Sequence, residues 1–297
     1  MPTRDFALLA AICLVWAGNN IVSKIIIAHF GAPPLFYATA RFALVTLLTL
    51  PWLLPAPRPL GRLVLIALLM GAAPFGLVFM GLKTTAPSSV AIVAQLGLPI
   101  SIALSAILLG EHIPLRRAVG MVLTLAGVVL VMWDPAGFRL GPGLLFVVGS
   151  AATGALGAVL MKGTDGVRPL TFQAWVGLAG VVPLALLTTT LEHGQTAVLA
   201  SAPWQFFAAV AFSGIVVSVV AHTAYFGLIQ RYEVNLLQPL MLMTPLANIA
   251  LGVMITHDHF DLRMAVGSAV ALAGVLIIAL PAGQTGGFRR LFGRFGA

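Results

Sequence analysis

The first apolar run of the sequence, Phe6–Phe30, carries polar side chains near its middle. Trp16, Asn20 and Lys24 follow one another at a spacing of four, which places them on one helix face, and Asn19 lies beside them. Amides donate and accept hydrogen bonds, and an ammonium attracts a carboxylate, so this face could line a polar cavity. The amides could equally join neighbouring helices, and Lys24 could extend to the water interface from about 9 Å beyond the midpoint. Both interpretations stay open for these residues.

Later runs place further polar and aromatic side chains on shared helix faces. His222 lies one turn after Ser218 and one turn before Tyr225. It is the strongest single candidate for contact with a solute, although a lone histidine can also bond a neighbouring carbonyl. We predict a substrate-binding set made of Trp16, Asn19, Asn20, Lys24, Phe75, Phe79, Gln95, His222, Tyr225, Gln238 and Met241. Its aromatic and methionine members would form an apolar wall with a few polar groups, which suits small neutral or zwitterionic solutes.

Two prolines lie at matched places in the sequence. Pro99 lies one turn after Gln95, and Pro245 lies one turn after Met241 on the same helix face. A proline removes a backbone hydrogen bond and can bend a helix. We therefore predict hinges at Pro99 and Pro245.

The composition requires a lipid environment for most of the chain. Of the 297 residues, 60% are hydrophobic and only 8% are charged, and the mean hydropathy is +1.06. Soluble domains are about 45–50% apolar and about 25% charged, so this chain has too little polar surface to be one of them. The net charge of +8 does not indicate nucleic-acid binding, because the cations are scattered over short loops.

The sequence predicts an all-α polytopic membrane protein, because spanning helices need about 20 apolar residues and the runs do not alternate as barrel strands do. We expect the first run to be retained as a helix. Ten runs meet the requirement: Phe6–Phe30, Leu35–Leu54, Leu63–Leu82, Ser88–Leu109, Leu115–Trp133, Gly143–Met161, Leu170–Leu191, Trp204–Ile229, Leu236–Ile255 and Met264–Pro281.

The distribution of Lys and Arg predicts the orientation of these ten helices. With a cytoplasmic N-terminus, eleven cations fall in inside loops: Arg4, Arg58, Arg62, Arg116, Arg117, Lys162, Arg168, Arg231, Arg289, Arg290 and Arg294. Only Lys83, Arg139 and Arg263 fall outside. The positive-inside rule therefore predicts that both termini are cytoplasmic, in the inner membrane of a cell. Arg41 lies near the outer end of the second run, and we interpret it as an interfacial anchor.

The two halves of the sequence resemble each other. Residues Phe79–Pro99 align with Tyr225–Pro245, and Glu111–Val128 aligns with Asp258–Val275, where "AVG" and "LAGV" recur in register. Five helices in each copy would make the copies antiparallel in the membrane, as in many secondary transporters. We predict two inverted five-helix repeats, residues 1–137 and residues 138–297 with a short basic tail. The small residues of these motifs are assigned to helix packing.

At this level of detail the chain resembles the drug/metabolite transporter superfamily, and within it the EamA-type ten-helix exporters. The resemblance rests on Trp16, Asn19 or Asn20 and Lys24, on Pro34 with Arg41, and on the "GL…A…P…GE" run from Gly81 to Glu111. It covers the whole chain, and the similarity extends to YddG-type exporters of amino acids. The resemblance implies alternating access around a cavity between the repeats, and it favours a cavity role for Lys24.

All eight carboxylates lie in loops or at helix ends, so a carboxylate proton relay is not expected. This favours facilitated diffusion over a relay based on His222. No HExxH, GxSxG, Walker or CxxC motif occurs, and we expect no catalysis, no cofactor and no metal. The "HDHFD" loop, His257–Asp261, lacks the spacing of zinc motifs. We expect a monomer in the lipid bilayer.

Three other functions stay under consideration. A carrier of sugar phosphates or nucleotide sugars, or a drug carrier, would share the fold, but phosphate requires several cavity cations and only Lys24 qualifies. An intramembrane enzyme would need a catalytic dyad or metal ligands at membrane depth, where His222 stands alone. A gated pore would need a continuous polar stripe, which none of the ten runs has.

The predicted topology can be tested by cysteine labelling, because Cys13 is the single native cysteine. In a Cys13→Ser background, Arg4→Cys and Arg294→Cys should both react with a membrane-impermeant maleimide only after the inner face is exposed. Lys83→Cys should react from the outer face. Labelling of positions 4 and 294 from opposite faces would contradict an even number of crossings.

Overall fold

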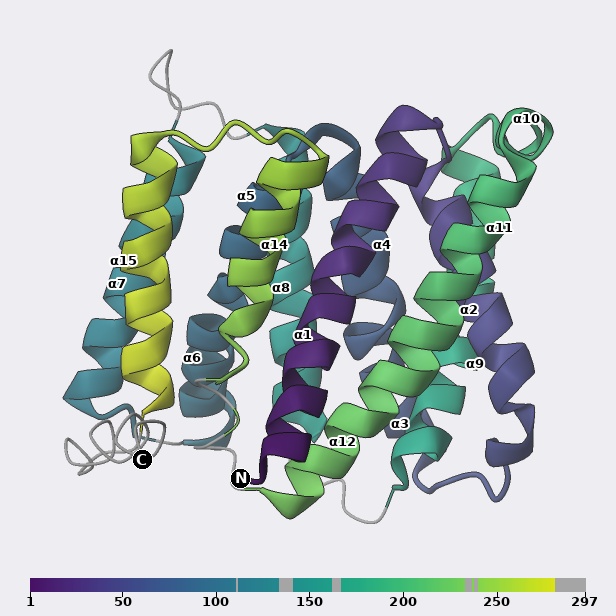
Figure 1. The fold of residues 1–297 in the computed structure, drawn as a ribbon. Coiled ribbons are helices and arrows are strands. Elements are labelled where there is room, and N and C mark those ends of the chain that lie inside the picture. The colour runs from purple at the N-terminus through teal and green to yellow at the C-terminus, as the bar shows by residue number, and fades with distance from the viewer. Residues whose placement is uncertain (111, 134–140, 162–166, 233–236, 238–239, 281–297) are drawn as a thin grey trace.

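The computed structural model describes residues 1–110, 112–133, 141–161, 167–232, 237 and 240–280. All regular structure in these residues is helical, which confirms the all-α membrane fold (Figure 1). Within them, nine helical segments are long and apolar enough to cross a membrane. In chain order these segments are α1 (Thr3–Lys24) with η1 (Ile25–His29), α2 (Pro34–Thr49) with η2 (Leu50–Trp52), α3 (Leu60–Met70) with α4 (Ala72–Thr84), α5 (Pro87–Val93) with η3 (Ala94–Leu96) and α6 (Gly97–Leu109), α7 (Leu115–Met132), α8 (Pro142–Met161), α9 (Pro169–Leu191), α11 (Pro203–Ala211) with η4 (Phe212–Ala221) and α12 (His222–Arg231), and α15 (Leu262–Ala279).

The ninth expected span, Leu236–Ile255, differs from its sequence prediction. Its described helix, α14 (Met243–Ile255), is shorter than the run Leu236–Ile255, and Met241 and Leu242 form a turn before it. Residues 233–236 and 238–239 lie outside the described part. A short helix, α10 (Gln195–Ser201), was not expected between the seventh and eighth spans.

Several spans depart from regular α-helix in their interiors. The third span breaks at Gly71, where φ is −119° and ψ is −90°. A Cβ at this position would lie 2.4 Å from the Val176 side chain, so only glycine fits there. The eighth span contains the ten-residue π-helix η4, and the fourth contains the 3-10 turn η3. Irregular backbone of this kind inside a membrane protein is tolerated where it is buried in protein or lines a cavity, and it often marks functional sites.

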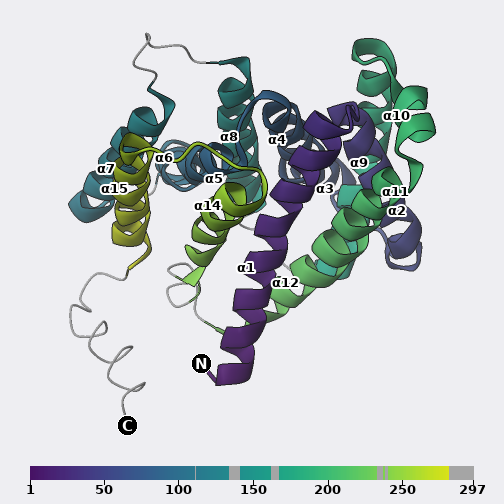
Figure 2. The same ribbon diagram turned by 45° about the horizontal axis from the view of Figure 1, so that its top comes forward.

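The main helix pairs join the first half of the chain to the second. Helix α7 packs against α15, α2 against α9, α4 against α8, and α1 against α14. Helices α7 and α15 lie side by side at one edge of the bundle in both views (Figures 1 and 2). Helix α1 begins, and α15 ends, at the same end of the bundle (Figure 1).

Glycines bring α7 and α15 into backbone contact. A Cβ on Gly127 would lie 2.3 Å from the nitrogen of Ala271, and one on Gly267 would lie 2.9 Å from the Gly127 carbonyl oxygen. A Cβ on Gly274 would lie 2.6 Å from the Gly120 carbonyl oxygen. The helices are therefore antiparallel, and each "AVG" glycine meets the "LAGV" glycine of the other copy. The repeated motifs form this packing interface, as expected for small residues in membrane helices.

At one end of the bundle, carboxylates of the second half cap helices of the first half. The Glu192 carboxylate accepts hydrogen bonds from the backbone N–H groups of Leu35 and Phe36, at 2.9 and 3.0 Å, where α2 begins. The Asp258 carboxylate accepts one from the Ser88 N–H at 2.9 Å, where α5 begins. The first N–H groups of a helix lack partners within the helix, and a negative charge favours them.

At the opposite end, arginines of the first half cap helices of the second. Arg62 donates to the Leu160 carbonyl at 3.0 Å near the end of α8, and Arg116 donates to the Ile277 carbonyl at 2.7 Å near the end of α15. Tyr232 donates a hydrogen bond to Asp5 there, and this bond raises the pKa of the phenol. Both ends of the bundle are thus joined across the halves.

Replacing one packing glycine tests the contact between α7 and α15. Gly127→Ala should lower stability by about 1–3 kcal/mol, because the added methyl group has no space. Gly227→Ala is the matched control, since nothing lies within 4 Å of a Cβ there, and it should be neutral or slightly stabilising because alanine favours helix. The midpoints of thermal unfolding in detergent measure the stability of both variants. Equal midpoints for the two variants would contradict the contact.

Candidate functional site

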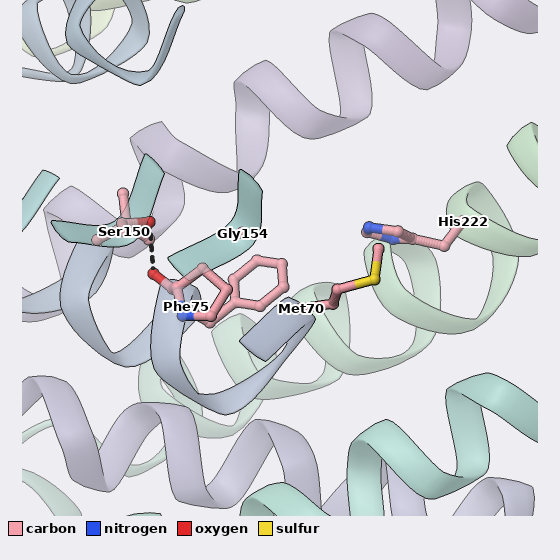
Figure 3. Close-up of a pocket in the computed structure, with 7 residues that line it drawn as sticks. Met70, Phe75, Ser150, Gly154 and His222 are labelled. Carbon is pink, nitrogen blue, oxygen red and sulfur yellow. Dashed lines mark hydrogen bonds between the residues drawn. The ribbon is translucent and has the colours of Figure 1, made fainter. Parts of the chain in front are cut away.

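A pocket of about 280 Å³ lies beside the break in the third span. Residues from α3, α4, α8 and α12 line it, among them Met70, Phe75, Ser150 and His222 (Figure 3). The Ser150 hydroxyl donates to the Pro74 carbonyl at 2.8 Å, so this polar group is already satisfied. The wall is largely apolar with a histidine at one side, the usual character of a small-molecule site.

His222 enters the pocket from the first residue of α12. Its Nδ1 lies 2.7 Å from the Val217 carbonyl oxygen, five residues earlier in the π-helix η4. Because a carbonyl can only accept, Nδ1 carries a hydrogen, and Nε2 is then the acceptor of a neutral ring. Figure 3 shows the imidazole directed toward Met70 across the pocket.

Aromatic rings surround His222 and continue the wall toward α1. The Trp16 ring lies 4.9 Å from the His222 ring and 5.1 Å from the Tyr225 ring, measured between centroids. The Phe75 and His222 centroids are 6.5 Å apart. Met241 packs into the same apolar cluster as Trp16 and Tyr225. The structure therefore brings together five members of the predicted set.

The adjacent amides of α1 bond to two different helices. The Asn19 side chain is buried and accepts a hydrogen bond from the Ser213 hydroxyl of η4 at 2.8 Å. Asn20 donates to the Asn248 side chain of α14 at 3.2 Å. Both amides thus join helices, which agrees with one of the two interpretations of their sequence. A role of Asn20 in contact with solute stays a prediction.

Lys24 lies at one end of α4 rather than in the pocket. Its ammonium donates to the carbonyls of Leu82 and Thr85, at 2.9 and 3.1 Å, and interacts electrostatically with Asp258. A cation at a helix C-terminus satisfies carbonyls that lack partners within the helix. The ammonium therefore has a structural function in this conformation.

The other predicted residues lie at varied distances from the pocket. Phe79 is fully buried, with its ring centroid 4.9 Å from that of Tyr37. Gln95 is half-buried in η3, and Gln238 falls outside the described residues. Of the two expected hinges, Pro99 follows the 3-10 turn η3 and Pro245 lies in the first turn of α14. Bending at either proline stays a prediction.

Arg41 is deeply buried, so its interpretation as an interfacial anchor is wrong. Its side chain is 1% exposed, and Nε and Nη2 donate to the Ser218 hydroxyl at 3.1 and 2.9 Å. Its Cζ atom lies 4.0 Å from the centroid of the Phe75 ring. The sequence did contain a sign of this burial. Arg41 lies seven residues after Pro34, where α2 begins, and this spacing places it about 10 Å into the helix.

Carboxylates of the His257–Asp261 loop accept hydrogen bonds at the starts of helices. Asp258 accepts hydrogen bonds from Ser88 and from the Thr256 hydroxyl, the latter at 2.7 Å, and Asp261 accepts from the Met264 N–H at 2.8 Å where α15 begins. In the part of the chain that the structure describes, no group of three or more His, Cys, Asp or Glu side chains could hold a metal ion.

Broken membrane helices around a pocket that both halves of the chain line are typical of membrane transporters. The family model described as the EamA-like transporter family matches residues 5–133 and again residues 141–280. The chain belongs to this family.

Named relatives agree with this assignment at low identity. The "Probable amino-acid metabolite efflux pump" of Escherichia coli (strain K12) is 23% identical over 93% of this chain and 95% of its own. The "Uncharacterized transporter YvbV" of Bacillus subtilis (strain 168) is 24% identical over 93% and 92%. A solved crystal structure matches with a TM-score of 0.64 at 21% identity, covering 98% of this chain and all of the other. This last likeness shows the fold.

Replacing Lys24 tests its structural function. Lys24→Met should lower stability by about 1 kcal/mol, because the Leu82 and Thr85 carbonyls lose their donor. Lys83→Met removes the same charge from an exposed position nearby and should leave the thermal midpoint unchanged. A Lys24→Met protein as stable as the Lys83→Met protein would show that the capping bonds contribute nothing.

Proposed function

We propose that this protein is a carrier that exports small neutral or zwitterionic metabolites, chiefly amino acids with apolar or aromatic side chains, across the inner membrane. The observation that carries the proposal is the pocket of about 280 Å³ next to the broken third span, with His222 on an otherwise apolar wall. Its size and lining suit one small amphipathic solute. The name of the Escherichia coli relative, an amino-acid metabolite efflux pump, supports the substrate class and the direction.

The proposed mechanism is alternating access by movement of two inverted repeats, residues 1–137 and 138–297. With cytoplasmic termini, the contacts of Glu192 and Asp258 lie at the outer end. Both contacts connect the halves, so they would have to break when the pocket opens to the outside. A single chain would form the whole path.

We propose that the solute moves by facilitated diffusion, without coupling to a proton gradient. The carboxylates of Asp5, Glu192, Asp258 and Asp261 lie at or beyond helix ends in the structure, and the sequence places the other four in loops. Proton-coupled carriers usually carry a titrating carboxylate or histidine within the membrane. His222 is the remaining candidate for such a titrating group. Transport measured with and without a pH gradient tests whether it couples proton movement to transport.

Uptake into liposomes that contain only this protein tests the proposal. Labelled leucine or phenylalanine should enter in a saturable manner, at the same rate with and without a pH gradient. His222→Ala should raise the KM about tenfold, because the solute loses a hydrogen-bond partner in an apolar site. The exposed His193→Ala is the matched control and should leave KM unchanged.

The possible results separate the parts of the proposal. Absence of uptake for every amino acid would contradict the substrate class. Uptake that depends on the gradient would contradict facilitated diffusion. Equal KM values for His222→Ala and His193→Ala would place the binding site elsewhere.

A further inference from the structure

Arg41 has hydrogen-bonding capacity that the described structure does not use. Its Nε and Nη2 donate to one oxygen, that of Ser218, whose own hydroxyl donates to the Ser213 carbonyl at 2.9 Å. Nη1 is buried and has no hydrogen-bond partner among the described residues. The guanidinium is planar, so fixing its Nε–Nη2 edge leaves the Nη1–Nη2 edge facing away from Ser218.

The charge of Arg41 also lacks a counter-ion in the described residues. None of the described carboxylates lies within 4.0 Å of it, and its close neighbours include the rings of Phe42, Phe75 and Phe79. A buried charge without a partner is strongly unfavourable, and cation–π contact offsets only part of the cost. An ionisable residue inside a membrane protein is therefore a candidate for a functional site.

Phe75 separates this charge from the pocket. One side of its ring covers the Arg41 guanidinium at 4.0 Å, and Phe75 also lines the pocket beside His222. Rotation of this one aromatic side chain would therefore open the guanidinium group to the pocket. Figure 3 shows Phe75 on the opposite side of the pocket from the helix that carries His222.

We propose that Arg41 binds the carboxylate of the transported solute through the Nη1–Nη2 edge, with Phe75 covering the guanidinium group until the solute enters. Two parallel N–H···O bonds match a carboxylate. Nε2 of His222 is an acceptor within the same pocket, and it would accept a hydrogen bond from the solute's ammonium. Together the two side chains recognise an α-amino acid by both of its charged groups. This inference rests on the proposed function, and it specifies that the solute must carry a carboxylate.

Competitors test the inference on the unchanged protein. In the liposome assay with labelled phenylalanine, unlabelled phenylalanine should compete at least tenfold more strongly than 2-phenylethylamine, which lacks the carboxylate. 3-Phenylpropionate, which keeps the carboxylate and lacks the amine, should compete better than 2-phenylethylamine. This test needs no variant, so it decides the question even if substitutions of Arg41 fold poorly.

Two substitutions of Arg41 then assign the effect to this residue. Arg41→Gln should raise the KM for phenylalanine at least tenfold and leave competition by 2-phenylethylamine unchanged. Arg41→Lys keeps the positive charge but lacks the paired N–H groups of the guanidinium. Its KM should therefore lie between that of the unchanged protein and that of Arg41→Gln. The exposed Arg117→Gln is the control and should behave as the unchanged protein. Because the buried charge is removed, the thermal midpoint of Arg41→Gln should hold or rise, whereas a purely structural arginine would lower it.

The outcomes distinguish this inference from the proposed function. If phenylalanine is transported but 2-phenylethylamine competes equally well, or Arg41→Gln keeps its KM, the carboxylate site is overturned and the carrier function stands. If no amino acid is transported, the function and the inference fall together.

Discussion

Lipid supplies no hydrogen bonds, so polar groups inside this bundle depend on partners within the protein. That constraint explains the contacts between the two halves of the chain. Glu192 and Asp258 of the second half satisfy the N–H groups at the starts of α2 and α5, while Arg62 and Arg116 of the first half satisfy carbonyls near the ends of α8 and α15. Arg62 and Arg116, which the positive-inside rule assigns to the cytoplasmic side, thus also join the two halves at one end of the bundle.

The same constraint applies to the irregular backbone inside the spans. The break at Gly71, the 3-10 turn η3 and the π-helix η4 all lie inside spans, where their freed backbone groups need partners from the protein. The π-helix supplies one such partner, since the Val217 carbonyl fixes the His222 ring. Two of the irregular segments therefore border the pocket, since Met70 directly precedes Gly71 and His222 directly follows η4.

The fold was largely accessible from the sequence because membrane helices must be apolar along their whole length. The predicted runs agree with the observed helices within a few residues for nine of ten spans, and the repeated "AVG" and "LAGV" motifs form the α7–α15 contact. The short helix α10 and the turn at Met241 and Leu242 before α14 were missed, because neither has a distinct hydropathy signal.

The sequence by itself determined that the chain is a bundle of membrane helices and which residues could line its interior. Hydropathy and charge act along the chain, so they can be counted without knowing which helices touch. Only the tertiary structure decided that Lys24 caps α4, that Asn19 bonds to Ser213, and that Arg41 is buried against Phe75. Each of these depends on contact between helices far apart in sequence, and the direction of a long polar side chain is set by those neighbours.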